Sequence, residues 1–293
     1  MKTTTFRSTV CFLALLAMFL PSFAIADIKT APQRHVVLIG IDNYAPSKLA
    51  PLQYCKSDVK KLKVALLQSG FSEKYDSIVT MTDDAKDASL KPTKANILNV
   101  LTNIRDRVKE MENAVKGGDK IIVYFSGHAG TFDGAPTLAP MDFDLEQPKA
   151  TGLAVADMVA SLKDCKADLR LFLFDAMPFL GLVDKKDLMV LPPRTAVFCA
   201  AKPGFKAYEL PEFEGGIFTH HVIKGLLDEA DRCGDVNGKV DLGELYLYVK
   251  TQSAKDAYKS FGNRMVPGLI VSNDIDDIFN LEILGKPSTL LSP

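Results

Sequence analysis

The residues best placed to do chemistry in this chain stand at the ends of two apolar segments. The first segment, KIIVYFSGH, runs over residues 120–128 and ends in His128, while the second, LRLFLFDAM, runs over 169–177 and ends in Asp175 and Met177. Both read as buried strands, and the carboxyl ends of parallel strands meet at one edge of a sheet, where open α/β proteins usually place their sites. We therefore expect His128 and residue 177 to face each other.

A histidine at such an edge suits nucleophilic catalysis, because an imidazole facing a cysteine can act as a general base or as the ion-pair partner of a thiolate. This chain offers Met177 at that place, and a thioether has no ionisable proton. Pro178 follows, which lacks a backbone N–H and favours extended backbone angles at residue 177. The expected nucleophile is therefore missing.

Strand-like and helix-like segments alternate around these two strand ends. Segments that read as strands occupy residues 35–41, 75–84, 120–128, 169–177 and 195–201. Amphipathic helical patterns occupy residues 57–71, 91–119 and 153–163. This alternation predicts an α/β fold with a mainly parallel sheet covered on both faces. Residues 129–152, rich in Gly, Pro and Asp, are expected to form a long loop, which at such a length is usually functional or disordered.

Taken together, these motifs resemble the caspase-like family of metacaspases, paracaspases and bacterial caspase homologues. The resemblance is carried by HVVLIGIDNYAPSKLAPLQYCKSDVKKLKVALLQSGF, by GGDKIIVYFSGHAG, by the segment from APMDF to VASL, and by GGIFTHHVIKGLLDEAD with GDVNGKVDLGELYLYV. It implies a caspase-like three-layer α/β/α domain with a mainly parallel central sheet. That domain would occupy residues 27–293, with a core over about 34–282.

The resemblance also assigns roles to particular residues. His128 stands where the family has its catalytic histidine, and Met177 stands where the family writes the cysteine of D-A-C-H-S-G or D-S-C-H-S-G. Asp58 and Asp175 stand where metacaspases line a pocket for a basic substrate side chain. From the residues alone, ordinary structural roles stay open: Asp58 can cap a helix and Asp175 can accept backbone hydrogen bonds.

Three functions are compatible with this pattern. The first, which we favour, is an exported pseudopeptidase that binds a basic peptide or a protein partner without cleaving it. The second is an active cysteine endopeptidase with a relocated nucleophile, for which Cys199 at the end of the next strand is the candidate. The third is a calcium-responsive interaction module.

The calcium hypothesis depends on the segment CGDVNGKVDLGE, residues 233–244, which nearly fits an EF-hand loop. Cys233 occupies the first position, where calcium disfavours a sulfur ligand. The alternative is a polar helix–turn–helix with Gly238 at a positive φ. We expect no cofactor other than this calcium ion, whose candidate ligands are Asp235, Asn237, Asp241 and Glu244.

Residues 1–26 have the pattern of a secretory signal peptide. Lys2 and Arg7 precede a short apolar run, and the segment ends Ala24-Ile25-Ala26. Cleavage near Ala26 would deliver a secreted or periplasmic protein with no further membrane segment. The remainder has 33 basic and 36 acidic residues and no basic run, so we expect no nucleic-acid partner. The sequence gives neither the pairing of its cysteines nor its oligomeric state.

Overall fold

The computed structural model describes residues 33–44, 49–73, 76–112, 118–177, 191–202 and 204–285. The expected signal peptide lies outside these residues, and so does Pro178. Within the described ranges, no helix has both the length and the apolar character needed to cross a membrane.

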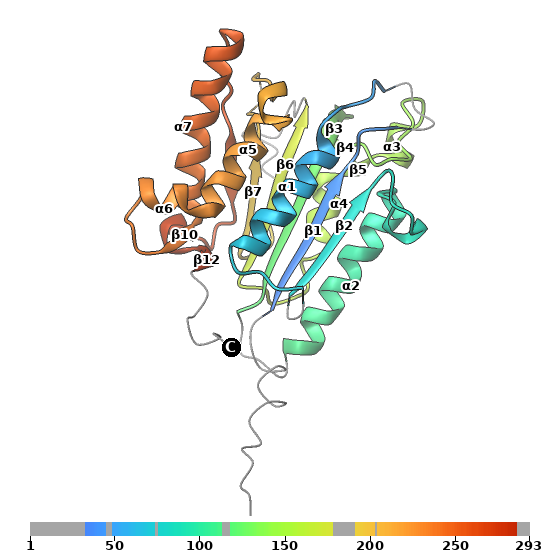
Figure 1. Cartoon of the computed structure of the whole chain (residues 1–293). Helices are drawn as coiled ribbons and strands as arrows, with labels where there is room; N and C mark the ends of the chain where they lie inside the picture. Colours follow the sequence, from blue (N-terminus) through green and yellow to red (C-terminus); the bar gives the residue numbers. More distant parts are fainter. Residues whose placement is uncertain are drawn as a thin grey trace, which may run out of the picture.

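A mainly parallel sheet forms the centre of the domain, in the order β11-β7-β6-β3-β1-β2 (Figure 1). Its parallel strands are β1 (Arg34–Gly40), β2 (Ser77–Thr82), β3 (Lys120–Phe132), β6 (Leu169–Met177) and β7 (Thr195–Cys199). The edge strand β11 (Gly268–Val271) pairs with β7 in the antiparallel direction. The predicted α/β class and parallel sheet are thus confirmed.

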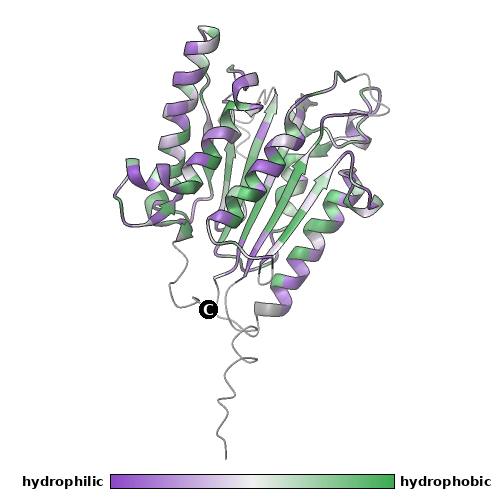
Figure 2. Cartoon of the chain, viewed as in Figure 1, coloured by the Kyte–Doolittle hydropathy of each residue, from purple (hydrophilic) through white to green (hydrophobic). Residues whose placement is uncertain are grey.

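Helices cover both faces of this sheet (Figure 1). One face carries α1 (Cys55–Gln68), α5 (Ile217–Lys224) and α7 (Leu242–Phe261), and the other carries α2 (Lys94–Glu112) and α4 (Val155–Ala160). Strand side chains alternate between the two cores: Val36 and Leu38 join the first, whereas Val37 and Ile39 join the second. The strands are accordingly apolar on both faces, and the polar helix surfaces point outward (Figure 2).

The segment expected to be a long loop is largely ordered. Strand β3 continues to Phe132 and turns back into β4 (Ala135–Leu138), which in turn pairs with β5 (Leu153–Ala154). Asp133 and Gly134 form the turn with φ of 50° and 77°, the left-handed angles that an Asp-Gly hairpin requires. The Asp-Gly pair was the sequence signal for this hairpin. A short helix, α3 (Pro148–Thr151), lies near the end of the segment.

The remaining elements surround the end of the sheet that holds β7 and β11. The short pair β8 (Glu209–Leu210) and β9 (Gly215–Gly216) precedes α5. After α5 the chain kinks at η4 (Gly225–Glu229), where Leu227 and Asp228 leave the helical angles, and then forms α6 (Ala230–Cys233). Strands β10 (Lys239–Asp241) and β12 (Glu282–Gly285) pair beside α7, and the 3-10 turn η5 (Ile278–Asn280) lies between β11 and β12.

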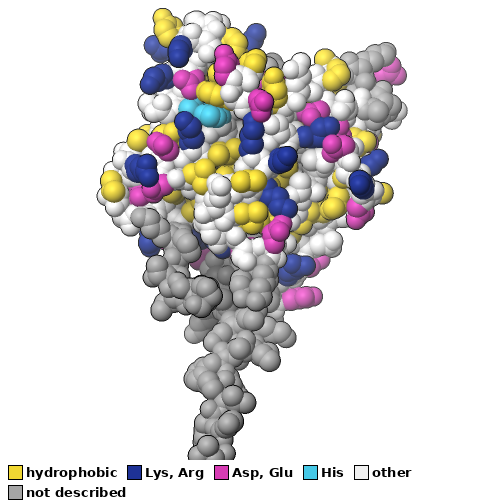
Figure 3. Space-filling model, viewed as in Figure 1, with side chains coloured by type: hydrophobic (Ala, Val, Ile, Leu, Met, Phe, Trp, Pro, Cys, Tyr) yellow, Lys and Arg dark blue, Asp and Glu magenta, His cyan; other side chains and the backbone are white. Residues whose placement is uncertain are grey.

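Surface charge is mixed on the face that Figure 3 shows. Basic and acidic side chains alternate there, and hydrophobic side chains gather between them near the middle of the view. Val64 and Leu67 of α1 are among the exposed hydrophobic residues, at 47% and 37%.

Candidate functional site

His128 is half-buried in β3, at the carboxyl-terminal edge of the parallel sheet. Its backbone N–H donates to the Tyr44 hydroxyl at 2.7 Å, and its Nε2 lies 2.8 Å from the Ala50 carbonyl oxygen. Its ring also contacts the ring of Tyr44, with centroids 5.0 Å apart. The loop that follows β1 therefore fixes both the backbone and the side chain of this histidine. Tyr44 and Ala50 gave no signal in the sequence.

The Ala50 contact determines which nitrogen of a neutral His128 carries the proton. A carbonyl oxygen can only accept, so Nε2 must be the donor. Nδ1 is then left with its lone pair, which is the form that a general base needs. The Ala50 carbonyl therefore orients the imidazole as a base.

The structure pairs His128 with Met177. Strands β3 and β6 run parallel in register, with Ser126 opposite Asp175 and His128 opposite Met177. The expected proximity of these two positions is therefore confirmed for the backbone. Pro178 and the residues up to 190 lie outside the described ranges.

Asp58 lies in the first turn of α1 and is 2% exposed. It does not cap its own helix, because Tyr54 occupies the N-cap without a side-chain bond. Instead its carboxylate accepts the backbone N–H of Gly216, at 3.1 Å to Oδ2, and Gly216 is the N-cap of α5. This carboxylate therefore joins the start of α5 to α1.

Asp175 binds the same helix start from the sheet side. Its Oδ2 accepts the Thr219 hydroxyl at 2.6 Å and the Thr219 backbone N–H at 3.2 Å. Because the Thr219 hydroxyl donates to Asp175, the Tyr124 hydroxyl, 2.7 Å away, donates to it in turn. Asp175, which is itself 8% exposed, is therefore the end of a hydrogen-bonded chain that starts at Tyr124 and passes through Thr219.

The two aspartates lie close enough to influence each other, and a third acid joins them. Burial, and then the neighbouring Asp175 charge, raises the pKa of Asp58 well above its usual range. Burial raises the pKa of Asp175 to about 6 against the opposing effect of the Thr219 hydrogen bonds. Burial and then Asp175 raise the pKa of Glu209, in β8, to about 7. Sequence reasoning missed Glu209, whose position depends on the pairing of β8 with β9.

No basic side chain among the described residues pairs with Asp58, Asp175 or Glu209 at hydrogen-bond or ion-pair distance. The Lys61 charge lowers the pKa of Asp58, but the Lys61 Nζ donates its hydrogen bonds to the carbonyl oxygens of Phe213 and Glu214. The three carboxyls thus form an acid cluster whose charge is not neutralised within the described part of the chain. Buried carboxylates that have no basic neighbour favour a cationic partner.

Cys199, the candidate for a relocated nucleophile, is buried at the end of β7. It is 3% exposed, its thiol donates to the Gly268 carbonyl at 3.5 Å, and burial raises its pKa to about 12. A nucleophile of this type needs access and a low pKa. Cys55 is also buried, with its pKa raised well above the usual range by burial. The geometry gives no support to either thiol as the nucleophile.

The proposed calcium loop brings only part of its expected ligand set together. Asp235 and Glu244 converge with Asp231, with oxygens within 4.8 Å of one another. Asp241 instead caps α7, accepting the N–H of Glu244 at 2.8 Å, and Asn237 donates its side-chain amide to Asp235. Asp231, which the EF-hand pattern omits, accepts the Gly238 N–H at 3.0 Å.

The backbone of this loop agrees with the alternative interpretation, a polar helix–turn–helix. Gly238 has a φ of 81°, as a polar turn before α7 requires. The Glu244 carboxylate accepts backbone N–H groups from Asp235 and Asp241, at 3.1 and 3.2 Å. The loop is therefore held together by its own amides, and three carboxylates are fewer oxygen ligands than calcium usually takes.

Comparison with known proteins places this geometry in a family. The model of the caspase domain, peptidase C14, matches residues 33–270, which includes both strand ends and the acid cluster. The chain is 34% identical over 96 residues to metacaspase-6 of Arabidopsis thaliana, an alignment that covers 32% of this chain and 23% of that protein.

Two fungal proteins give similar alignments. Metacaspase-1 of Meyerozyma guilliermondii is 29% identical over 126 residues, covering 37% of this chain and 28% of that protein. Metacaspase-1 of Eremothecium gossypii is 32% identical over 120 residues, covering 38% and 24%. The alignments thus span less than a third of each relative's length.

Proposed function

This chain belongs to the caspase domain family, and we propose that it is an exported pseudopeptidase of that family. It binds a basic side chain of a peptide or protein ligand at the carboxyl edge of its sheet and does not hydrolyse the ligand. The observation that carries the binding proposal is the acid cluster of Asp58, Asp175 and Glu209, which has no basic partner among the described residues.

The chemistry of the acid cluster selects the ligand. A guanidinium or ammonium group would restore the charged form of carboxyls whose pKa values burial has raised, and it would supply the missing hydrogen-bond donors. Glu209 is half-buried, whereas Asp58 and Asp175 are buried beneath the start of α5. A basic side chain would therefore meet Glu209 first and reach the aspartates behind it.

The proposed loss of hydrolysis is supported by the residue that pairs with His128 in the register of β3 and β6. The imidazole keeps an oriented Nδ1, but a methionine at position 177 offers no proton for it to remove. Pro178 removes one backbone donor beside that position. Export is proposed from the signal-peptide pattern of residues 1–26, which would make the mature protein secreted or periplasmic.

Binding is tested with a pair of peptides that differ in charge alone. N-acetyl-Gly-Gly-Arg-amide and its citrulline analogue have nearly the same shape, so calorimetric titration should detect the arginine peptide at least tenfold more tightly. Glu209→Gln should abolish this preference. Asp157→Asn, which removes an exposed acid from α4, should leave it intact. Equal affinity for both peptides would refute the basic pocket.

Lack of hydrolysis is tested by restoring the family's residues. Met177→Cys combined with Pro178→His should generate cleavage after arginine, and adding His128→Ala should remove that cleavage again. If the restored protein stays inactive while it still binds the arginine peptide, the loss of catalysis extends beyond the nucleophile.

The active-enzyme alternative predicts a different outcome with an alkylating peptide probe that ends in arginine. Covalent labelling of Cys199 in the native protein, lost in Cys199→Ala, would overturn the pseudopeptidase proposal. Its burial beside Gly268 leads us to expect no labelling.

A second candidate function, calcium response, is favoured by the convergence of Asp231, Asp235 and Glu244. Glu244→Gln is a suitable variant because glutamine also completes a capping box, so that α7 keeps its N-terminus. A rise in melting temperature with millimolar calcium that this variant removes would support a calcium site. An unchanged melting temperature would exclude the calcium hypothesis.

A further inference from the structure

The last turn of α7 projects beyond the body of the domain, at the carboxyl end of the parallel strands (Figure 1). Ala257 is the last buried residue of this helix, and the seven residues that follow it, 258–264, are all exposed. Phe261 lies one turn after Ala257, on the face that is buried earlier in the helix. Its side chain is nevertheless 41% exposed. The helix therefore extends past the core that its apolar face covers.

The segment that follows β7 lies beside this helix end. The N–H of Lys202 donates to the carbonyl oxygen of Val266 at 2.7 Å. The rings of Tyr208 and Phe261 stack with their centroids 4.5 Å apart, which joins the two segments a second time. Phe205, between these two contacts, is 38% exposed. Aromatic side chains from two separate segments therefore meet at one projecting end of the molecule.

Eight side chains of these two segments form what we call the aromatic–basic tip. Its aromatic members are Phe205, Tyr208, Tyr258 and Phe261, and its basic members are Lys202, Lys206, Lys259 and Arg264. Hydrophobic and basic side chains accordingly gather at the upper left of Figure 3, where α7 ends. Tyr258 is the most exposed of the four aromatic residues, at 64%.

The charge of the aromatic–basic tip differs from that of the whole chain, whose formal net charge is −1. No acid occurs in residues 201–208 or 257–267. Asp256, the last acid of α7, is bound to His221 at 2.9 Å. Burial raises the pKa of Glu209, which follows Tyr208, to about 7, so this acid opposes the positive charge only in part at neutral pH. The tip is therefore a local positive region on a slightly acidic protein.

This combination of charge and exposed rings matches the chemistry of an anionic membrane surface. Aromatic rings favour the boundary between lipid headgroups and acyl chains, and lysine and arginine are attracted to anionic phospholipids. A projecting tip can bring all its members onto a flat, deformable lipid surface at once. A peptide or a folded partner would instead have to wrap around the end of the helix to reach both segments.

We propose that the aromatic–basic tip docks this protein reversibly on membrane surfaces that contain anionic phospholipids. The exposed rings of Phe205, Tyr258 and Phe261 enter the interface, and the ammonium and guanidinium groups lie at the level of the lipid phosphates. The proposal does not use the acid cluster, and it holds whether or not the chain binds basic peptides.

The test measures binding to lipid vesicles of two compositions. It uses the chain from Asp27 onward, which contains every described element and lacks the apolar run of residues 1–26 that would itself enter lipid. Co-sedimentation at low salt should show at least tenfold tighter binding to vesicles of phosphatidylcholine with phosphatidylglycerol than to phosphatidylcholine alone. Salt at about 0.5 M should remove this binding by screening. Equal binding to both compositions, or no binding to the anionic vesicles, would overturn the proposal.

Charge variants separate the tip from the overall charge of the protein. Lys259→Gln combined with Arg264→Gln should weaken binding to the anionic vesicles by at least tenfold, since each cation near such a surface contributes about fivefold. Arg107→Gln combined with Lys109→Gln is the matched control, because both side chains are exposed on α2, across the sheet from α7. This control should bind like the unmodified chain. Equal losses in the two double variants would contradict a localised docking surface.

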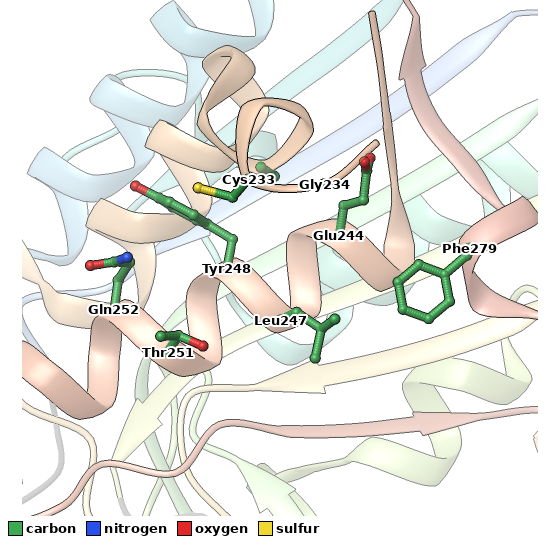
Figure 4. Close-up of a pocket in the computed structure, with 9 residues that line it drawn as sticks. Cys233, Gly234, Glu244, Leu247, Tyr248, Thr251, Gln252 and Phe279 are labelled. Atoms are coloured by element: carbon green, nitrogen blue, oxygen red, sulfur yellow. The ribbon is translucent and has the colours of Figure 1, made fainter. Parts of the chain in front are cut away.

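Tryptophan substitutions locate the lipid contact, because the chain has no tryptophan of its own. Tyr258→Trp places the reporter in the tip, and Phe279→Trp places it at a control position that is also exposed, at 49%. Phe279 lies beside Leu247 near the start of α7 (Figure 4), and its ring fills the space next to Gly243. At 1.5 Å per helical residue, Gly243 and Tyr258 are about 22 Å apart.

Anionic vesicles should move the fluorescence of Tyr258→Trp to shorter wavelength, and acyl-chain-brominated lipids should quench it. Phe279→Trp should show neither effect. Equal shifts in both variants, or no shift in Tyr258→Trp when the protein is bound, would overturn the assigned surface. Soluble polyglutamate is the competitor that distinguishes an acidic protein partner from lipid. If polyglutamate displaces the protein from vesicles and Tyr258→Trp never shifts, the tip binds acidic protein and the lipid proposal is wrong.

Discussion

At the scale of single residues, the loop after β1 organises the histidine edge. His128 is bound through its backbone by Tyr44 and through its ring by the Ala50 carbonyl, and both partners lie in the loop after β1. These contacts set the tautomer and the direction of Nδ1. The loop after β1 therefore sets the arrangement of this histidine.

The acid cluster gives the protein a distinctive dependence on pH. The folded-state pKa values of Asp175 and Glu209, about 6 and about 7, lie above those of ordinary carboxyls. Between about pH 4 and pH 7 the native state therefore holds more protons than the unfolded chain, so these groups favour folding at acid pH and lose that contribution as pH rises through the folded pKa values.

We expect urea denaturation of the free protein to show this loss between pH 5 and pH 8, and Glu209→Gln to reduce it. The affinity for an arginine peptide should change in the opposite direction, rising as the carboxyls ionise. Affinity that is independent of pH over this range would contradict the charge state assigned to the cluster.

Cysteine reactivity is a second prediction at this scale. Cys233 is exposed, whereas Cys55 and Cys199 are buried with raised pKa values. Iodoacetamide at pH 8 should modify Cys233 in the native protein, and the buried thiols only after denaturation. Peptide mapping assigns each site, and rapid native labelling of Cys199 would contradict its burial.

At the scale of elements, the start of α5 connects the acid cluster to the rest of the fold. Gly215 and Gly216 form β9, and a Cβ on either would collide with a carboxylate, that of Asp58 for Gly215 and that of Asp175 for Gly216. The close approach explains why glycines occupy both positions. It also lets the N–H of Gly216 reach Asp58.

We predict that Gly216→Ala displaces the Asp175 carboxylate and weakens arginine-peptide binding by at least tenfold, without changing any charge. Gly127→Ala is the matched variant, because its Cβ would lie 2.5 Å from the Tyr44 hydroxyl and would disturb the His128 contact instead. That variant should retain the preference for arginine over citrulline. Equal losses in both variants would indicate general unfolding, which circular dichroism would detect.

The start of α7 offers a further prediction for an element. Asp241 and Glu244 form a capping box that satisfies backbone donors at the first turn of this 20-residue helix. Asp241→Ala should lower the free energy of unfolding by about 1 kcal/mol, because it removes the oxygen that accepts the Glu244 N–H. Urea denaturation checks this value, and an unchanged free energy of unfolding would contradict the capping geometry.

At the scale of the whole molecule, the buried Arg170 holds two chain connections against the central sheet. Arg170 of β6 is 3% exposed and donates to the backbone carbonyls of Leu162, Cys165 and Pro193. These carbonyls belong to the chain after α4 and to the segment before β7. The guanidinium therefore holds two connections against the central strand.

Arg170→Met should lower the free energy of unfolding by about 2–4 kcal/mol, because it leaves buried carbonyl groups without donors. Arg107→Met, on the exposed side of α2, is the matched control and should change it by less than about 0.5 kcal/mol. Denaturation curves compare the two, and a small effect at Arg170 would mean that water replaces the guanidinium.

The sequence by itself determined the alternation of strands and helices, the parallel sheet, and the meeting of His128 with residue 177. These features follow from short-range patterns: an apolar run shows a buried strand, and a shared carboxyl edge follows from parallel pairing. The Asp133–Gly134 hairpin was missed, although its signal was present in the sequence.

The tertiary structure alone decided how the site is held together. Glu209 joins Asp175 through the β8–β9 pair, Ala50 reaches His128 across 78 positions of the chain, and Thr219 reaches Asp175 across 44. Such contacts carry no local pattern, since a backbone carbonyl or a hydroxyl acts at whatever point the fold brings it to.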